Sequence, residues 1–121
     1  MIDFIKNQRN SVFTRSQWFV HNDVNVYLRA GSRYYDQRHG KYIPAIAIAN
    51  VNVDQHLQKT GKFSSFLREI EALAKSLKYE AVFVEQVGNS DLRTYLAKCG
   101  YEVVNPNVEH MSDSHFVKNI V

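Results

Sequence analysis

The chain has 121 residues, of which 45% are hydrophobic. That length can bury one core but is too short to divide comfortably into two, so we expect a single domain over residues 1–121. The 15 Lys and Arg residues against 12 Asp and Glu residues give a formal charge of +3. This charge favours anionic partners, but it falls short of the charge density of a dedicated nucleic-acid binder.

Cys99 is the only cysteine, which excludes an intramolecular disulfide and fits a reducing compartment. The first ten residues lack the apolar core of a signal peptide. The most apolar run, residues 43–49, is far shorter than the roughly 20 residues of a membrane-spanning helix. We therefore expect a cytoplasmic protein that does not interact with a membrane.

The first third of the chain predicts mainly β-structure. Residues 1–8 have the apolar spacing of a short helix. Residues 17–30 predict a β-hairpin, because the pair Asn22-Asp23 separates two β-prone runs and tolerates the left-handed backbone of a tight turn. Residues 31–42 place polar and aromatic side chains between two glycines, which predicts an exposed loop or an irregular hairpin.

A long strand and an amphipathic helix follow. Residues 42–53 are apolar and β-prone, and their alternation slips by one residue near Asn50, which indicates a β-bulge. Residues 63–77 predict a helix of about four turns. Apolar side chains at helical spacing carry that prediction: Phe63, Phe66, Leu67, Ile70, Leu73, Ala74 and Leu77.

The last third of the chain alternates strands with a helix. Residues 79–87 are rich in β-branched side chains, and residues 89–100 predict a helix that Gly100 ends. Residues 101–104 and 108–121 predict two further strands. Because the strands come first and the helices late, the order of elements predicts an α+β domain with a mixed sheet.

The loop before the first long helix has the composition of an anion site. Residues 58–63 read Gln-Lys-Thr-Gly-Lys-Phe. Free amides at the start of a helix carry partial positive charge, so a pyrophosphate can bind to them. Gly61 lets the backbone turn closely around phosphates, and Lys59 and Lys62 add compensating charge. The alternative is a helix start that contains a glycine without binding anything.

This loop resembles the acetyl-coenzyme A loop of the GNAT superfamily of N-acetyltransferases. The family pattern is Gln or Arg, two residues, Gly, one residue, then Gly or Ala, and only Phe63 departs from it. The resemblance extends over the order of elements between Ile43 and Val104. It implies a mixed, mostly antiparallel sheet with splayed central strands and flanking helices, and acetyl-coenzyme A as co-substrate. The implied cofactor-binding residues are Val51, Val53, Gln58, Lys59, Thr60, Gly61, Lys62 and Asn89.

A second match lies at residues 85–101, which are similar to the ending of small phage and bacterial members of the superfamily. Asn89 aligns with the asparagine that binds the pantetheine arm. Many members carry a tyrosine four residues before the helix-ending glycine, where it protonates the departing thiolate. Here that position is Leu96, and Tyr95 is its neighbour, turned by about 100 degrees on the helix.

Acetyl transfer needs a base for the amine proton and a donor for the thioester carbonyl. The backbone amides around Val51 and Val53, exposed by the expected bulge, can supply that donor. For the base we consider Glu85, Asp54 and His56, and we rank Glu85 first because it precedes the region where the central strands should splay. Each of them can equally be a solvated or salt-bridged side chain. The resemblance implies direct attack without a covalent enzyme intermediate.

The basic and aromatic residues of the 29–42 segment are the candidates for acceptor binding. In the superfamily this segment lies on the acceptor side, so Arg33, Tyr34, Tyr35 and Arg38 are expected to contact an amine acceptor. Their mixture suits an anionic acceptor, such as a nucleotide, a nucleic acid or an acidic protein. The alternative is a polar loop whose tyrosines cover a sheet edge.

Two other interpretations stay open. One is a catalytically inactive domain of this fold that binds nucleic acid or a protein through the 29–42 segment, and the other is a phage-type enzyme that modifies nucleobases. A homodimer is compatible with the sequence. No metal site is recognised, because His110 and His115, five residues apart on a predicted strand, face opposite sides.

Overall fold

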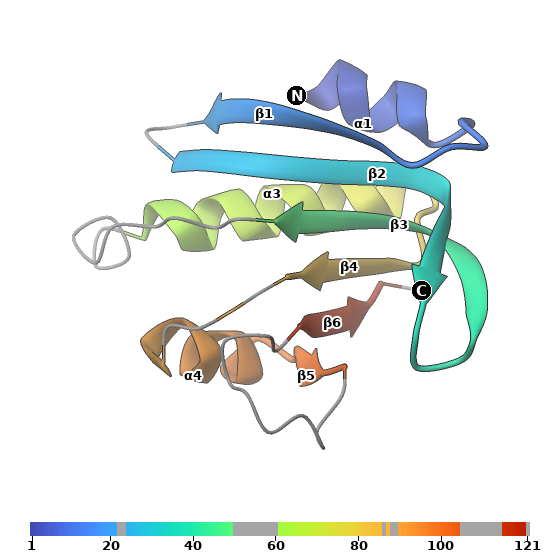
Figure 1. Cartoon of the computed structure of the whole chain (residues 1–121). Helices are drawn as coiled ribbons and strands as arrows, with labels where there is room; N and C mark the ends of the chain where they lie inside the picture. Colours follow the sequence, from blue (N-terminus) through green and yellow to red (C-terminus); the bar gives the residue numbers. More distant parts are fainter. Residues whose placement is uncertain (22–23, 50–60, 86, 88–89, 105–114, 121) are drawn as a thin grey trace.

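The computed structural model describes residues 1–21, 24–49, 61–85, 87, 90–104 and 115–120. Their elements, in chain order, are α1 (Ile2–Gln8), β1 (Arg15–His21), β2 (Val24–Asp36), β3 (Lys41–Ala49), α3 (Lys62–Ser76), β4 (Ala81–Val84), α4 (Ser90–Lys98), β5 (Glu102–Val103) and β6 (Phe116–Asn119). Figure 1 shows them as one layer of strands with α3 running behind it.

The strands form one sheet in the order β1-β2-β3-β4-β6-β5. Every neighbouring pair is antiparallel except β3 and β4, which are parallel because α3 connects them as a crossover. The expected α+β fold with a mixed, mostly antiparallel sheet and flanking helices is therefore confirmed. The expected splay of the central strands falls largely on residues that follow β3 and β4 and lie outside the described ranges.

The main core lies between the sheet and the described helices. Alternate residues of the strands, such as Leu28, Ile48 and Val84, point toward the helices. The helices contribute apolar side chains to the same cluster, including Ile5 of α1, the predicted core stripe of α3, and Leu92 and Leu96 of α4. Burying this apolar surface is the main force that holds the layers together.

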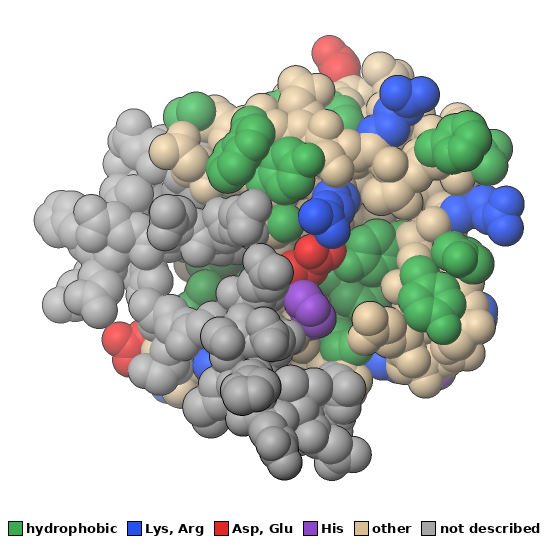
Figure 2. All heavy atoms as spheres, viewed as in Figure 1, with side chains coloured by type: hydrophobic (Ala, Val, Ile, Leu, Met, Phe, Trp, Pro, Cys, Tyr) green, Lys and Arg blue, Asp and Glu red, His purple; other side chains and the backbone are tan. Residues whose placement is uncertain are grey.

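The opposite face of the sheet has a smaller cluster that comes from strands alone. It consists of Ile43, Ala45, Ala47, Ala81, Phe83 and Val117, with Tyr34 and Val104 packed against it. Figure 2 shows this face, where acidic, basic and histidine side chains meet near the centre. Small alanines on β3 leave room there for larger side chains from β2.

The segment expected to be an exposed loop or an irregular hairpin at residues 31–42 is an irregular hairpin. β2 continues to Asp36, and β3 begins at Lys41. The register of β2 on β3 shifts between Gly31 and Tyr34, which turns the end of the hairpin relative to its start. The bulge expected near Asn50 falls outside the described residues.

Gly31 is required at this bend. A β-carbon at Gly31 would lie 2.9 Å from Thr14 Cα and 3.2 Å from the carbonyl oxygen of Phe13. The backbone of the segment before β1 therefore passes too close for any other residue. Ser32 reinforces the contact, because its amide and hydroxyl both donate to the carbonyl oxygen of Ser11.

The helix predicted over residues 63–77 is α3, and Phe63 is buried in the main core as its helical spacing predicts.

The N-terminal helix also packs on this core, since Tyr79 donates a 2.5 Å hydrogen bond to the carbonyl oxygen of Ile5. Burial raises the pKa of Tyr79 to about 12. None of the described helices has the length and apolar character needed to cross a membrane.

The helix predicted at residues 89–100 is α4, and Gly100 follows it with a left-handed φ of 92°. The strand predicted at 101–104 is the short β5. Among the described residues of the predicted 108–121 strand, Phe116–Asn119 form β6, which inserts between β4 and β5. Residues 108–114 and 121 of that prediction lie outside the described ranges.

Candidate active site

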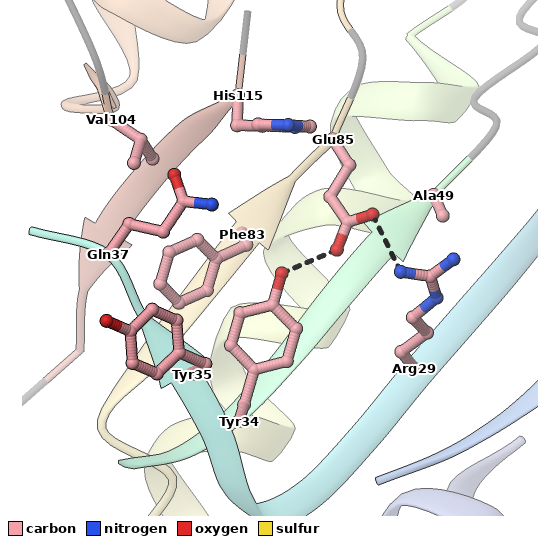
Figure 3. A pocket seen from close by; sticks show the side chains of 9 residues that line it. All are labelled: Arg29, Tyr34, Tyr35, Gln37, Ala49, Phe83, Glu85, Val104 and His115. Carbon is pink, nitrogen blue, oxygen red and sulfur yellow. Dashed lines mark hydrogen bonds and ion pairs between the residues drawn. The ribbon is translucent and has the colours of Figure 1, made fainter. Parts of the chain in front are cut away.

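A cavity of about 310 Å³ opens on the face of the sheet opposite α3. Its walls come from β2, the turn after it, and the ends of β3 and β4. The residue after β5 and the residue before β6 complete the lining. Among the described residues, nine line it: Arg29, Tyr34, Tyr35, Gln37, Ala49, Phe83, Glu85, Val104 and His115 (Figure 3).

Glu85 occupies the centre of the cavity wall. It directly follows β4, and its amide donates a 2.9 Å hydrogen bond to the carbonyl oxygen of Ile48 on β3. Strand alternation places Val84 in the main core and therefore turns Glu85 to the cavity side. The residue is only 9% exposed. A nearly buried carboxylate requires partners, and β2 provides two.

Both oxygens of Glu85 accept a hydrogen bond. The hydroxyl of Tyr34 donates to Oε1 at 2.5 Å, and Arg29 Nη1 lies 3.3 Å from Oε2. Figure 3 shows both side chains converging on the carboxylate from β2. Each oxygen has a further lone pair, so the carboxylate can still accept a proton from a third group.

Tyr34 keeps its proton at neutral pH. Its ring lies against Phe83, with 4.7 Å between the ring centroids. Burial raises the pKa of Tyr34, and the hydrogen bond to Glu85 raises it further. Tyr34 is therefore a hydrogen-bond donor that holds Glu85 in place.

Arg29 belongs to a row of stacked side chains that leads away from the cavity across β2 and β1. Its guanidinium lies 5.9 Å from the centroid of the Tyr27 ring. Tyr27 in turn contacts Trp18, its partner on β1, with ring centroids 5.1 Å apart. Exposed aromatic surface and a cation thus continue one wall of the cavity onto the open face of the sheet.

The four residues expected to bind the acceptor divide into three places. Tyr34 and Tyr35 line the cavity. Arg33 lies on the outer side of the hairpin, 5.4 Å from the Tyr42 ring centroid, and Tyr42 makes an edge contact of 5.2 Å with Tyr35. Arg38 does not line this cavity: it belongs to a buried ion-pair cluster, and its guanidinium lies 5.7 Å from the ring centroid of Phe83, a lining residue.

That cluster is centred on Asp36, whose side chain is almost fully buried. Arg38 donates to Asp36 through its backbone amide and twice through its guanidinium, each at 3.0 Å, and it also donates to Asn119. His39 Nδ1 lies 3.0 Å from the second oxygen. Burial by itself raises the pKa of Asp36, but the hydrogen bonds from Arg38 and His39 outweigh it, so the pKa lies below its usual range.

At the start of α3, the described residues provide no side-chain cap. Gly61 adopts a left-handed φ of 76° with no side-chain cap, and the first turn has no acidic residue. A β-carbon at Gly61 would meet no atom of the described residues within 4 Å. The side chain of Phe63 points into the core, so it does not project toward the approach to the amides.

Tyr95 on α4 points to the first turn of α3. Its hydroxyl donates to Ser64 Oγ at 2.5 Å, and Arg68 Nη2 also donates to that oxygen, at 2.9 Å. Burial raises the pKa of Tyr95, so the hydroxyl is protonated at neutral pH. Its neighbour Leu96 is fully buried in the main core.

Most of the predicted cofactor loop lies outside the described residues. Val51, Val53, Asp54, His56, Gln58, Lys59, Thr60 and Asn89 lie outside the described ranges, as does the side chain of Lys62. Of the predicted residues that are described, the structure brings Glu85, Tyr34 and Tyr35 together in one cavity, and it brings Tyr95 to the start of α3 near Gly61.

Sequence reasoning did not assign a role to five of the lining residues: Gln37, Ala49, Phe83, Val104 and His115. Phe83 and Ala49 alternate with core residues on their strands, so a strand prediction with the correct register would have placed them on the cavity face. Gln37 and His115 reach the cavity from a turn and from the residue before β6. No local pattern signals that convergence, because it depends on how distant segments pack.

No known family model matches the sequence, and no curated protein matches it. Comparison with solved structures gives clear matches. A GNAT-family acetyltransferase from Staphylococcus aureus is 9% identical with a TM-score of 0.54, over 79% of this chain and 60% of its own. An acetyltransferase from Bacillus cereus is 18% identical with a TM-score of 0.56, over 93% of this chain and 77% of its own.

A third match is the toxin AtaT, in a structure with acetyl-coenzyme A and the C-terminus of the antitoxin AtaR. It is 19% identical with a TM-score of 0.56, over 80% of this chain and 58% of its own. The chain thus spans about 60% of the length of the S. aureus enzyme and of AtaT. Such identities establish the fold alone. The chain therefore has the fold of the GNAT superfamily of acetyltransferases, as its loop pattern and its order of elements predict.

Proposed function

We propose that this chain is an N-acetyltransferase that binds acetyl-coenzyme A at the start of α3 and transfers the acetyl group to an amine beside Glu85. One observation carries the proposal. A nearly buried carboxylate lies in an open cavity at the end of the parallel β3–β4 pair, where Tyr34 and Arg29 hold both of its oxygens. A protein of the same fold, AtaT, has been seen with acetyl-coenzyme A bound.

The start of α3 supports the phosphate-binding part of the proposal. Its amides carry no side-chain cap from Gly61 and face no acidic residue in the first turn. A pyrophosphate suits such a terminus, because the outward amides and the helix dipole both favour negative charge. In the proposal, Gln58, Lys59, Thr60 and Lys62 complete this site, the backbone of Val51 and Val53 polarises the thioester, and Asn89 binds the pantetheine arm.

The proposed chemistry is a direct attack. The amine nitrogen attacks the thioester carbonyl carbon, a C–N bond forms and the C–S bond breaks, with its electron pair leaving on sulfur. The amine proton passes to the carboxylate of Glu85, directly or through a water molecule. Tyr34 and Arg29 hold that carboxylate in one orientation. Reaching the transition state therefore requires no further free energy to order the carboxylate.

The departing thiolate also needs a proton. Leu96 cannot supply one, and it is buried in the core. We assign this role to Tyr95, because its hydroxyl keeps its proton at neutral pH and lies at the first turn of α3, close to the proposed cofactor loop. Water is the alternative proton source.

The buried Leu96 also favours a second candidate, a domain of this fold that binds its partner without transferring acetyl. The two candidates differ in a simple way. A transferase must bind acetyl-coenzyme A and depend on Glu85, whereas a pure binding domain has no need of either.

A thermal-unfolding titration with acetyl-coenzyme A tests the proposal. At about 100 times its dissociation constant, a ligand stabilises the folded state by roughly 2.7 kcal/mol. We expect this shift for the wild type and its loss in Gly61→Glu, which places a carboxylate against the proposed pyrophosphate site. Gly40→Glu is the matched control, because Gly40 also has a left-handed φ, 62°, and open space around it. Absence of a shift in the wild type would remove the basis for the transferase.

A further inference from the structure

We propose that the open face of the sheet binds single-stranded nucleic acid, which stacks on two aromatic platforms on either side of the Glu85 cavity. As an identification of the acceptor, this inference rests on the proposed transferase function. As a statement about binding, it stands without acetyl-coenzyme A and is tested without it.

The first platform is formed by Trp18, Tyr27 and Arg29. Trp18 is 58% exposed although it is the largest side-chain type. It lies on Tyr27 with ring centroids 5.1 Å apart, and the guanidinium of Arg29 lies 5.9 Å from the Tyr27 centroid. Cross-strand pairing on β1 and β2 holds these side chains on the face of the sheet that carries the cavity.

The second platform is formed by Arg33, Tyr35 and Tyr42. Tyr35 and Tyr42 are directly opposed on β2 and β3, and they are 49% and 59% exposed. Their rings meet at 5.2 Å, and Arg33 lies 5.4 Å from the Tyr42 ring centroid. Exposed aromatic rings held by strand pairing and by a cation lose little freedom when a flat base stacks on them.

The two platforms flank one site. Arg29 of the first and Tyr35 of the second both line the Glu85 cavity. Figure 2 shows exposed hydrophobic side chains on both sides of the central charged group. A strand that crosses this face can therefore stack bases on each platform and place the segment between them over the carboxylate.

The charges on this part of the chain complement a phosphate backbone. In the sequence from Ser11 to Ala49 there are five cations, Arg15, Arg29, Arg33, Arg38 and Lys41, against two carboxylates, Asp23 and Asp36. Arg38 pairs with Asp36 and Arg29 pairs with Glu85, and the segment still has an excess of cations. Arginine beside exposed aromatic rings is the combination by which proteins bind single strands, because cations attract phosphates while rings stack on any base.

An acidic peptide fits this surface less well. A peptide with carboxylates would use the cations, but it offers no flat ring for Trp18, Tyr35 or Tyr42. A duplex keeps its bases paired and stacked internally, so it cannot use the platforms either. The exposed aromatic area therefore favours an unpaired strand, and in the proposed reaction the amine that Glu85 deprotonates is carried by that strand.

Fluorescence provides a direct test, because Trp18 is the only tryptophan. The protein without acetyl-coenzyme A is titrated with single-stranded DNA and RNA of about 12 nucleotides, a length comparable to known single-strand sites. Anisotropy of a labelled strand gives the affinity, and quenching of Trp18 reports stacking. Two control ligands lack bases. An abasic strand of the same length supplies the phosphates, and a poly-glutamate peptide supplies the negative charge.

We expect both natural strands, or one of them, to bind and to quench Trp18, and the abasic strand and the peptide to bind at least fivefold more weakly without quenching. Trp18→Ala and Tyr42→Ala should each weaken binding of the natural strand by roughly fivefold or more. Phe13→Ala is the matched control, because Phe13 is 72% exposed and belongs to neither platform. It should leave the affinity unchanged.

Several outcomes would overturn the inference. They are no binding by any natural strand, equal binding of the abasic strand or the peptide, preference for a duplex, or equal effects of Phe13→Ala and the platform variants. None of these bears on the thermal shift by acetyl-coenzyme A, so failure here and failure of the transferase proposal are separable.

Discussion

Tyr34 and Glu85 are 51 residues apart in the sequence, and the tyrosine hydroxyl donates a 2.5 Å hydrogen bond to the carboxylate. The bend of β2 after Gly31 makes this contact possible, since it carries Tyr34 across the alanines of β3 to the end of β4. A structural irregularity in one strand thus determines the environment of the candidate base on another.

We expect Tyr34→Phe to destabilise the protein by about 1.5–3 kcal/mol, because a hydrogen bond to a charged and nearly buried group is lost. The ring contact with Phe83 should remain. The variant also frees one oxygen of Glu85 from its fixed orientation, so kcat for acetyl transfer should fall because the base is less well positioned. Denaturant unfolding and the kcat of acetyl transfer measure the two effects.

Tyr101→Phe is the control for that variant. Tyr101 is also a buried tyrosine that donates to a glutamate, Glu71, at 3.4 Å, but it lies outside the cavity. It should change stability without lowering kcat. If Tyr34→Phe also leaves kcat unchanged, Tyr34 does not position the base.

Glu85→Gln should lower kcat for acetyl transfer by roughly 10²–10⁴-fold, the usual contribution of a general base. Binding of acetyl-coenzyme A should persist, because glutamine keeps the shape of the side chain and its oxygen can still accept from Tyr34 or Arg29. Glu71→Gln, which disturbs an ion pair with Lys118 on the other side of the sheet, is the comparison. Equal turnover in the two variants would rule Glu85 out as the base.

Tyr95→Phe should lower kcat by roughly tenfold or more with little change in KM, if its hydroxyl protonates the thiolate. Tyr79→Phe removes another buried tyrosine hydroxyl, the one bonded to Ile5, and should affect stability alone. Steady-state kinetics of both variants are compared on a thioester with a poor thiol leaving group and on one with a good thiol leaving group. Unchanged turnover in Tyr95→Phe would assign the proton to water.

Asp36→Asn should remove part of the acid sensitivity of folding. The folded-state pKa of Asp36 lies below its unfolded value of about 3.9. Its stabilising contribution is therefore complete above the unfolded value, and it is lost as the pH falls through the folded one. The free energy of unfolding of the variant should be lower at neutral pH, and the gap to the wild type should narrow as the pH falls below the unfolded-state pKa. Asp3→Asn, on the exposed part of α1, should show no such convergence.

The elements that the sequence predicts well are those with strong local periodicity. The α3 stripe from Phe63 to Leu77 is one, and the apolar run that becomes β3 is another. Glu85 was predictable as a candidate because it follows a buried strand, and the two sides of a strand alternate. These inferences need only neighbours in the chain.

The features that the sequence does not reveal depend on packing between distant segments. Residues 31–36 have the composition of a loop, but they continue β2. They do so because they pair with β3 and because the ring of Tyr34 packs against Phe83. Arg38 lies in the turn after β2, where its guanidinium packs against the carboxylate of Asp36. A run of alternating basic and aromatic letters cannot indicate which members share a face when a bulge interrupts the alternation.

Side chains alternate along β2 between the two faces of the sheet, so the register of β2 on β3 determines which of them face the cavity. Leu28 pairs with Ile48 toward the helices, and Arg29 pairs with Ala47 toward the cavity. A slip of β2 by one residue would bury a guanidinium among apolar side chains and place a leucine beside Glu85. The misaligned hairpin would therefore be unstable and would lack the contact between Arg29 and Glu85, so the forces that select the correct register also assemble the cavity wall.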